Sequence, residues 1–499
     1  MFIVVVIVLW LVLLFPDGIF PAVTSPRGVL ACVTAAVLAP PALGMVAARR
    51  ALRLLESLPS DPNPGQNAYA FGLDLVKYSL VGLHGGVLLL TGWPALCENV
   101  PRALDWPGVA GTLATIPFIV SLILVWISIY PAERAIRQIA LEQRLFRREP
   151  AHPVWSLREF LAFGIRHHLL IALIAIILLL VVRDSIEEHR VWLRATIRSE
   201  HAADLIIGAA QLLLLIIWPG LLPLVWDTRP LPAGPLRDRL MRLCGLLGVR
   251  FREILVWRSG GMITNALVAG VVGPMRYMLV TDGLLERMED EKIEAVVGHE
   301  SGHVKRLHLW YFLLFAFTSS CVVAIAYPFL RHSHVALYTG GAVVGVLLLI
   351  QWWPIFGWIA HQFERQADIF GVRALAAGGL ACHAPCPLHR PDGFASTPGR
   401  APAEERAVSG ALCPTAAHLY ANMLHDVARL NGIPPEESDW QHPSISDRAR
   451  MVEALAQDPR AVERFEARVT AIQRGIAVAA VVGVIGASIS LRVWTIFGI

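Results

Sequence analysis

The segment from His299 to His303 has the residue types and the spacing of a metal site. It reads His-Glu-Ser-Gly-His, with Glu300 directly after the first histidine. Residues four apart share one face of an α-helix, so both imidazoles can face one Zn²⁺ while the glutamate acts on a water molecule beside it. The pattern is short enough to arise by chance, in which case it is a polar helix start with two surface histidines.

A second polar segment, residues 361–368, supplies a third candidate ligand. It contains Glu364 and, four residues later, Asp368. On a helix these carboxylates share a face, so Glu364 can ligate zinc while Asp368 accepts the free N–H of a zinc-bound histidine. Alone, the pair would be an ordinary solvated helix face. Together with the first motif, it predicts one Zn²⁺ per chain, held by His299, His303 and Glu364, with one coordination position open.

The residues around both motifs predict the elements that position them. Asp290 is a good N-cap, acidic residues fill the next turn, and apolar residues recur at helical spacing over 293–297. Segments rich in Val, Ile, Leu and Tyr between Gly and Pro predict short strands. We expect strands over 253–258, 264–272 and 276–281, and helices over 236–247, 290–308, 361–377, 415–430 and 446–470.

The composition is typical of a polytopic membrane protein. The chain has 499 residues, and only 16% of them are charged. A membrane-spanning helix needs about 20 apolar residues. Candidate spans lie at 2–15, 29–48, 78–96, 109–130, 169–182, 205–226, 309–330, 335–360 and 475–491. The first and fifth are short, which leaves seven to nine spans, and the first has the character of a signal anchor rather than a cleaved signal.

Arginines in the loops predict the orientation. They are concentrated after the second span and in the loop after the fourth span, and few lie in most of the alternate loops. With nine spans, the excess of positive charge on the cytoplasmic side places the N-terminus and residues 227–308 and 361–474 in the cytoplasm. Both halves of the predicted zinc site then lie on one side, joined by the hairpin 309–360.

Several further motifs follow one another in a recognisable order. The first motif is followed by two spans and then by FERQADIFG, and three other stretches read ITNA from Ile263, RYMLVTDGLL from Arg276 and QHPSISDR from Gln441. His308 extends the first motif to HExxHxxxxH. This region, roughly residues 230–455, resembles the integral-membrane zinc metalloproteases related to CAAX prenyl protease 1 and HtpX, and the last pattern resembles the CAAX-protease branch.

The resemblance implies roles for three more residues. His442 or Arg448 would stabilise an oxyanion or position the substrate, and Asn265 would hold a peptide as an added strand beside the active site. Each has a structural alternative. Asn265 can be a turn residue, and Arg448 can form a salt bridge with an acid such as Asp368.

The expected fold is a multi-pass α-helical membrane protein with an α+β zincin-like metalloprotease domain, built from a small sheet and the motif-bearing helix. Residues 1–226 would form an N-terminal membrane domain of about six spans. Residues 227–474 would form the peptidase domain, interrupted by the hairpin 309–360 and a flexible insertion at 377–415. Residues 475–499 would hold the last span.

The expected function is zinc-dependent hydrolysis of peptide bonds, with Glu300 as the general base. The substrate would be a peptide or a membrane protein, in quality control or in a role not assigned by the sequence. The alternatives are a CAAX-type prenyl-peptide protease and, in a different class, a transporter or a catalytically silent scaffold. The expected location is a bacterial inner (plasma) membrane with the site facing the cytoplasm. The lipid bilayer is the expected surrounding, and no motif for nucleic acid is present.

The cysteines offer one further possibility. Cys382, Cys386, His389 and Cys413 have the residue types for a second zinc site. They lie in the Pro-, Gly- and Ala-rich insertion 377–415, so a flexible loop with incidental cysteines is the alternative.

Overall fold

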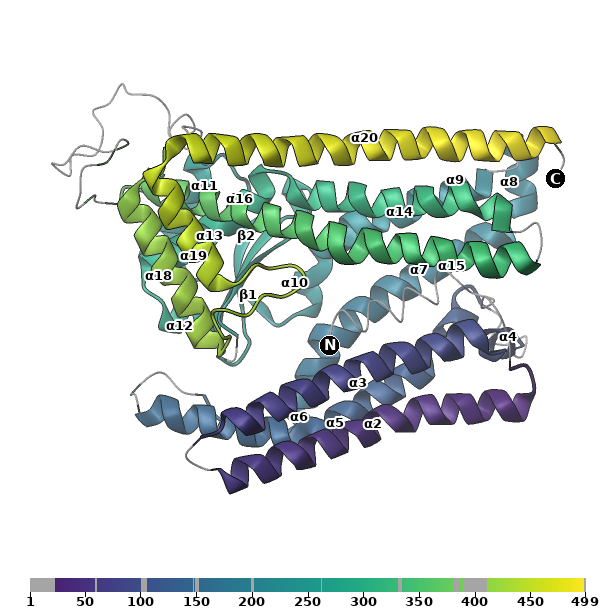
Figure 1. The fold of residues 1–499 in the computed structure, drawn as a ribbon, viewed down its shortest axis with the longest axis horizontal. Helices are drawn as coiled ribbons and strands as arrows, with labels where there is room; N and C mark the ends of the chain where they lie inside the picture. Colours follow the sequence, from purple (N-terminus) through teal and green to yellow (C-terminus); the bar gives the residue numbers. More distant parts are fainter. Residues whose placement is uncertain are drawn as a thin grey trace. The chain divides into compact units, whose positions relative to one another are not determined.

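The computed structural model describes residues 23–497 apart from 59–60, 100–105, 147, 149–151, 199–201, 262, 331–333, 381, 383–385, 387 and 389–410. The chain divides into two compact units, Met1–Asp227 and Thr228–Ile499 (Figure 1). The predicted span 2–15 and His389 lie outside the described residues.

The first unit is helical. Its longest helices, α2, α3 and α5, pack on one another around a core that includes Leu80, Phe118 and Leu122. Ser25 caps the first of them by accepting a hydrogen bond from the backbone N–H of Gly28, and proline occupies the start of that helix, where its missing N–H costs nothing. The elements are α2 (Pro26–Ser57), α3 (Asn63–Leu90), α4 (Trp93–Glu98), α5 (Val109–Phe146), α6 (Leu157–Gly164), η2 (Ile165–Leu170), α7 (Ile171–Glu188), α8 (Arg190–Ile197), α9 (Ala202–Ile217), η3 (Trp218–Leu221) and α10 (Leu222–Val225).

The second unit combines a small sheet with helices. A hairpin of long apolar helices, α14 and α15, interrupts it, and the last helix runs beside α14 (Figure 1). The elements are β1 (Thr228–Pro230), α11 (Pro235–Leu246), β2 (Glu253–Trp257), β3 (Ala266–Ala269), η4 (Gly273–Met275), β4 (Tyr277–Thr281), α12 (Asp282–Arg287), α13 (Asp290–Lys305), α14 (His308–Leu330), α15 (His334–Ile350), η5 (Gln351–Ile355), α16 (Phe356–Ala377), α18 (Pro414–Asn431), α19 (Ile445–Gln457) and α20 (Pro459–Phe497).

The sheet has the strand order β1-β2-β4-β3, so β3 is an edge strand. β2 and β4 are parallel, and β3 runs antiparallel to β4 with Ala266 opposite Val280. Gly270 directly follows β3 and has a φ of +101°. A Cβ at this position would lie 2.1 Å from the carbonyl oxygen of Met275. Only glycine fits this turn. The three strands expected from the sequence are present, and β1 is an addition.

Glycines bring α13 and α16 into close contact. A Cβ on Gly298 would lie 2.7 Å from Cβ of Ala374, and one on Gly371 would lie 3.3 Å from the backbone nitrogen of His299. Small residues on both helices therefore let the two backbones approach. The catalytic motif and the segment with Glu364 consequently face each other across a short distance.

Seven helices among the described residues are long and apolar enough to cross a membrane. This result supports the predicted fold class but corrects two of the expected spans. The segment 205–226 is broken at Pro219 and Pro223 into α9, η3 and α10. The span predicted at 78–96 is instead part of α3, which starts at Asn63 and ends at Leu90, shortly before Pro94.

Two local expectations were also wrong. Asp290 is the first residue of α13 rather than its N-cap, and the cap position, Glu289, makes no side-chain cap hydrogen bond. The acids of this turn instead pair with Arg239, which lies 2.7 Å from Glu294. The single helix expected over 446–470 is two helices, α19 and α20, because Pro459 starts a new helix.

Candidate metal centre

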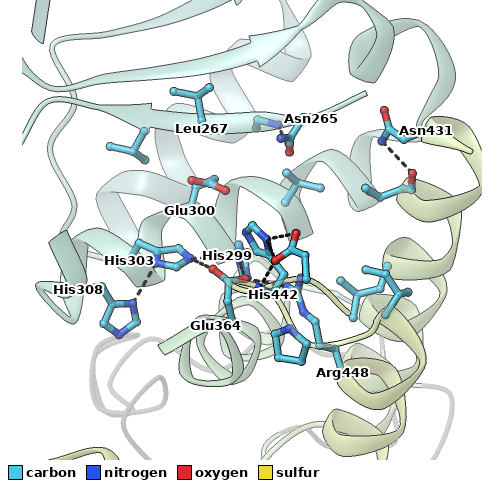
Figure 2. Close-up of a pocket in the computed structure, with 18 of the residues that line it drawn as sticks. Asn265, Leu267, His299, Glu300, His303, His308, Glu364, Asn431, His442 and Arg448 are labelled. Carbon is cyan, nitrogen blue, oxygen red and sulfur yellow. Dashed lines mark hydrogen bonds and ion pairs between the residues drawn. The ribbon is translucent and has the colours of Figure 1, made fainter. Parts of the chain in front are cut away.

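Three side chains from two helices converge in the second unit. His299 and His303 project from α13, and Glu364 projects from α16 (Figure 2). The two Nε2 atoms lie 3.2 Å apart, and oxygens of Glu364 lie 3.5 Å and 3.3 Å from them. Two ligands at about 2.05 Å from a tetrahedral zinc lie roughly 3.3 Å apart. The three side chains therefore fit zinc and leave one tetrahedral position open.

The charge state of His299 reflects this convergence. Burial disfavours a charged imidazole, but hydrogen bonds to Asp368 and Glu364 outweigh it and raise the pKa of His299 to about 9. Without a metal, His299 therefore carries a proton at neutral pH, and its positive charge attracts the carboxylates of Asp368 and Glu364. A zinc ion at the same place would supply positive charge in its stead.

Glu300 lies beside the ligands, on the side that faces the strand carrying Leu267 (Figure 2). Burial raises the pKa of its carboxyl, and the charge of Glu364 adds to this, whereas the two histidines lower it. A carboxylate with a raised pKa is a better proton acceptor near neutral pH. Glu300 is thus placed and tuned to take a proton from a water molecule in front of the three ligands.

Asp368 is fully buried and orients His299. Its Oδ1 lies 3.1 Å from Nδ1 of His299 and accepts a 2.8 Å hydrogen bond from the Tyr420 hydroxyl. That hydroxyl also lies 2.9 Å from the same Nδ1. Arg448 donates hydrogen bonds of 3.0 and 2.6 Å to the two carboxylate oxygens. The carboxylate is thereby fixed so that it accepts Nδ1–H of His299, which leaves the lone pair of Nε2 facing the metal position.

A chain of hydrogen bonds orients His303. Its Nδ1 lies 3.0 Å from Nδ1 of His308, whose Nε2 lies 2.9 Å from Oε1 of Gln366. The amide nitrogen of Gln366 donates a 2.6 Å hydrogen bond to Glu466. Because the Glu466 carboxylate only accepts, Gln366 turns its oxygen to His308, which then donates from Nε2 and accepts at Nδ1. The proton of His303 is therefore on Nδ1, and the lone pair of its Nε2 faces the metal position.

The ligands open into a cavity of about 860 Å³. Polar groups gather at the ligands, whereas much of the remaining wall is apolar. The junction of α13 and α14 and the start of α14 contribute Leu307, Trp310 and Phe312. The cavity thus joins a polar reaction centre to an apolar surface at the start of a long apolar helix.

The edge strand β3 turns part of its backbone toward this cavity. The N–H of Thr281 donates a 3.0 Å hydrogen bond to the carbonyl of Asn265, which makes these two residues a hydrogen-bonded pair. Pairing alternates along an antiparallel ladder, so the backbone groups of Ala266 and Val268 point to the open edge. The side-chain oxygen of Asn265 accepts the N–H of Ala266 at 2.9 Å. The carbonyl of Val268 faces the open edge, whereas its N–H donates a hydrogen bond to the carboxylate of Glu300.

His442 lines another part of the cavity. Its Nδ1 lies 3.0 and 3.1 Å from the two oxygens of Asp439. The hydrogen bond to Asp439 raises the pKa of His442. This contact therefore favours the protonated form of a ring that lines the cavity.

Residues 232–456 match Peptidase family M48. The chain carries an M48 peptidase domain. It is 25% identical over 179 residues to CAAX prenyl protease 1 homolog of Arabidopsis thaliana, covering 33% of this chain and 42% of that protein. It is 28% identical over 109 residues to Protease HtpX homolog 2 of Methanosarcina acetivorans, covering 22% of this chain and 34% of that protein. The matches thus span less than half of either relative.

The fold has a counterpart of known structure. The crystal structure of S. mikatae Ste24p aligns with a TM-score of 0.51 at 14% identity, over 85% of this chain and 98% of that chain. At this identity the likeness concerns the fold alone. The resemblance seen in the sequence is confirmed, and the protein is an integral membrane protein with an M48 metalloprotease domain.

The structure brings most of the predicted site residues of the M48 domain together. The three ligands, Glu300 and Asp368 meet at one point, and Asn265 and His442 line the same cavity. Arg448 forms the ion pair with Asp368 that the sequence left open as the alternative role. One of its nitrogens also lies 3.5 Å from Glu364.

Several residues of the site gave no signal in the sequence. Tyr420 and Glu466 lie on α18 and α20 and belong to no motif, and Gln366 of α16 lies within FERQADIFG without a role that the motif indicates. Asn431, at the end of α18, exchanges two hydrogen bonds with the backbone of Thr264 and holds the segment that leads into β3. Spacing along the chain cannot reveal such partners, because they meet only after the helices pack.

Proposed function

We propose that the protein is a membrane-embedded zinc endopeptidase. The observation that carries this proposal is the arrangement of His299, His303 and Glu364 at zinc-ligand separations, with Glu300 beside them in one cavity. Zinc held by these residues supplies a Lewis acid for the scissile carbonyl and lowers the pKa of a water molecule. A transporter or a silent scaffold would need neither the ligands nor the base.

Glu300 takes the proton of the attacking water on its carboxylate and passes it to the leaving amine. Asp368 and His308 keep the two ligating imidazoles in the required tautomer. His442, charged through its contact with Asp439, stabilises the oxyanion that develops on the carbonyl oxygen. Arg448 acts through Asp368 as a positioning residue.

The substrate binds as an extended strand along β3. The outward carbonyl of Val268 accepts a hydrogen bond from the peptide, and Asn265 fixes the start of that edge. Peptide pairing of this kind depends little on side chains, so specificity falls to the rest of the cavity.

The apolar wall supports substrates that come from the membrane. Leu307, Trp310 and Phe312 would accept apolar side chains of a membrane-protein segment, as expected for quality control. They would equally accept a prenyl chain, and the relative named CAAX prenyl protease 1 homolog makes a prenylated peptide the second candidate. With α9, η3 and α10 counted together as one crossing, the arginine-rich loops favour the cytoplasmic side for the site.

Glu300→Gln tests the mechanism. The variant keeps the three ligands, so we expect wild-type zinc content by elemental analysis. Cleavage of casein and of a prenylated peptide should fall at least about 100-fold, because the proton acceptor is lost. Glu289→Gln, an exposed acid at the start of the same helix, is the matched control and should cleave normally. Wild-type rates in Glu300→Gln would disprove the mechanism. Whichever of casein and the prenylated peptide the wild-type protein cleaves faster indicates the substrate class.

A further inference from the structure

Three cysteines form a cluster away from the catalytic centre. Sulfurs of Cys382, Cys386 and Cys413 lie within 4.8 Å of one another, and Cys382 and Cys413 are 3.2 Å apart. Cys382 follows the end of α16, and Cys413 precedes α18. Two thiolates on one tetrahedral zinc lie roughly 3.8 Å apart, given Zn–S bonds of about 2.3 Å. The separation of 3.2 Å is somewhat shorter than this value, and the upper limit of 4.8 Å for all three sulfurs lies above it.

We propose that Cys382, Cys386 and Cys413 bind one Zn²⁺ as thiolates and so tie the chain after α16 to the start of α18. Thiolate sulfur is a soft ligand that selects ions such as zinc, and three such ligands leave one position for water. This site is independent of the catalytic zinc.

The position of Cys413 at the start of a helix offers one interaction that stabilises a thiolate. The residue is the N-cap of the 18-residue helix α18, and its sulfur accepts the N–H of Ala416 at 3.4 Å. Partial positive charge at a helix start stabilises a thiolate.

Two simpler roles are less consistent with the geometry. A Cys382–Cys413 disulfide would not account for the position of Cys386 beside the other two sulfurs. The sulfurs of Cys382 and Cys413 are also 3.2 Å apart, well beyond a disulfide bond of about 2.05 Å. Cysteines that serve only as small core residues have no reason to place their sulfurs together. Cys386 is only half-buried and lies at the margin of the core that contains the other two cysteines.

Cobalt substitution of the full-length protein tests the proposal. The purified, reduced and metal-stripped protein is titrated with Co²⁺, whose thiolate complexes absorb in the near ultraviolet by charge transfer. We expect this band to saturate at one equivalent per chain and to disappear when Zn²⁺ is added. His299→Ala should leave the band unchanged, because the catalytic ligands contain no sulfur. The cobalt band therefore distinguishes loss of the cysteine site from loss of the catalytic zinc site.

Variants assign the band to the cluster. Cys386→Ser and Cys413→Ser should each remove or strongly weaken it, whereas Cys32→Ser, in the first unit, should not. The half-buried Cys386 carries the test if Cys413→Ser does not fold. Absence of the band from the wild type, its persistence in both cluster variants, or a Cys382–Cys413 disulfide in freshly purified protein would each overturn the proposal.

Discussion

At the scale of single residues, the candidate metal centre is defined by where two protons lie. Asp368 accepts a hydrogen bond from Nδ1–H of His299, and His308 accepts one from Nδ1–H of His303. Both imidazoles are thereby fixed with their Nε2 lone pairs toward Glu364. The two ligands thus have different supports, one anionic and one neutral, so each support can be tested separately.

His308→Phe is expected to weaken zinc binding. His308 stacks on Phe363 at 4.4 Å, so phenylalanine should keep the packing while removing both hydrogen bonds. Loss of a partner that orients a ligand typically lowers metal affinity or activity about 10–100-fold. Zinc affinity measured by competition with a chelator checks this, and His418→Phe, at an exposed histidine of α18, is the control. Unchanged zinc affinity in His308→Phe would show that the chain of bonds has no role in the site.

Zinc affinity should rise with pH. The pKa of His299 is raised to about 9 in the metal-free protein, so its proton stabilises that form below this pH and is lost above it. Zinc has to displace the proton, so affinity should increase about tenfold per pH unit between pH 6 and pH 8. Asp368→Asn removes the charge that raises this pKa and should flatten the dependence. Equal slopes in the two proteins would contradict the assignment.

At the scale of elements, close contact between α13 and α16 creates the site. The glycines at this contact lie within or beside the two motifs, yet their importance could not be read from the sequence. A helical glycine is recognised as a contact only when the opposite surface is known. For Gly371 that surface is the backbone of His299 on α13 together with the ring of Tyr420 on α18.

Gly371→Ala is expected to destabilise the protein and its zinc site. The added Cβ would lie 2.4 Å from Cε2 of Tyr420, and overpacking of this kind typically costs about 1–3 kcal/mol. Gly475→Ala, in α20, is a matched control because nothing lies within 4 Å of its added Cβ. Thermal unfolding in detergent should show a lower midpoint for the first variant and an equal or higher one for the second. A normal midpoint and zinc content in Gly371→Ala would disprove the role of this contact.

Local patterns predicted the elements better than their ends and their partners. The strands at 253–258 and 276–281 were recognised because segments rich in Val, Ile, Leu and Tyr lie between Gly and Pro breaks. The motif helix was recognised because ligand spacing and apolar spacing agree. The start of α16 at Phe356, ahead of the expected residue 361, was missed because the apolar span continues into it without a break. Glu466 was missed because its partners, Gln366, Arg306 and Arg373, are brought together only by tertiary packing.

At the scale of the whole molecule, the membrane helices are longer than a bilayer requires. α5 has 38 residues, which corresponds to roughly 57 Å, against about 30 Å for the hydrocarbon layer. Its C-terminal part carries Arg134, Arg137 and Arg144. The arginines used to predict the orientation therefore lie on a helical extension as well as in a loop.

Reporter fusions test that orientation. A reporter placed after residue 150 or after residue 460 should be cytoplasmic, and one placed near residue 334 should be external, because the arginine-rich side is retained in the cytoplasm. The fusion at 334 is the internal control for the hairpin. Reversed results at 150 and 460 would place the catalytic cavity on the other side of the membrane and change the pool of substrates.

The position of the hairpin of α14 and α15 also bears on how the protein is made. His299 and His303 leave the ribosome before the hairpin, whereas Glu364, Asp368 and the partner Tyr420 follow it. A nascent chain that has not yet inserted both spans holds at most two of the three ligands and neither support of His299. The full set of ligands therefore assembles only after membrane insertion, so unfinished chains cannot carry a complete peptidase centre among other newly made proteins.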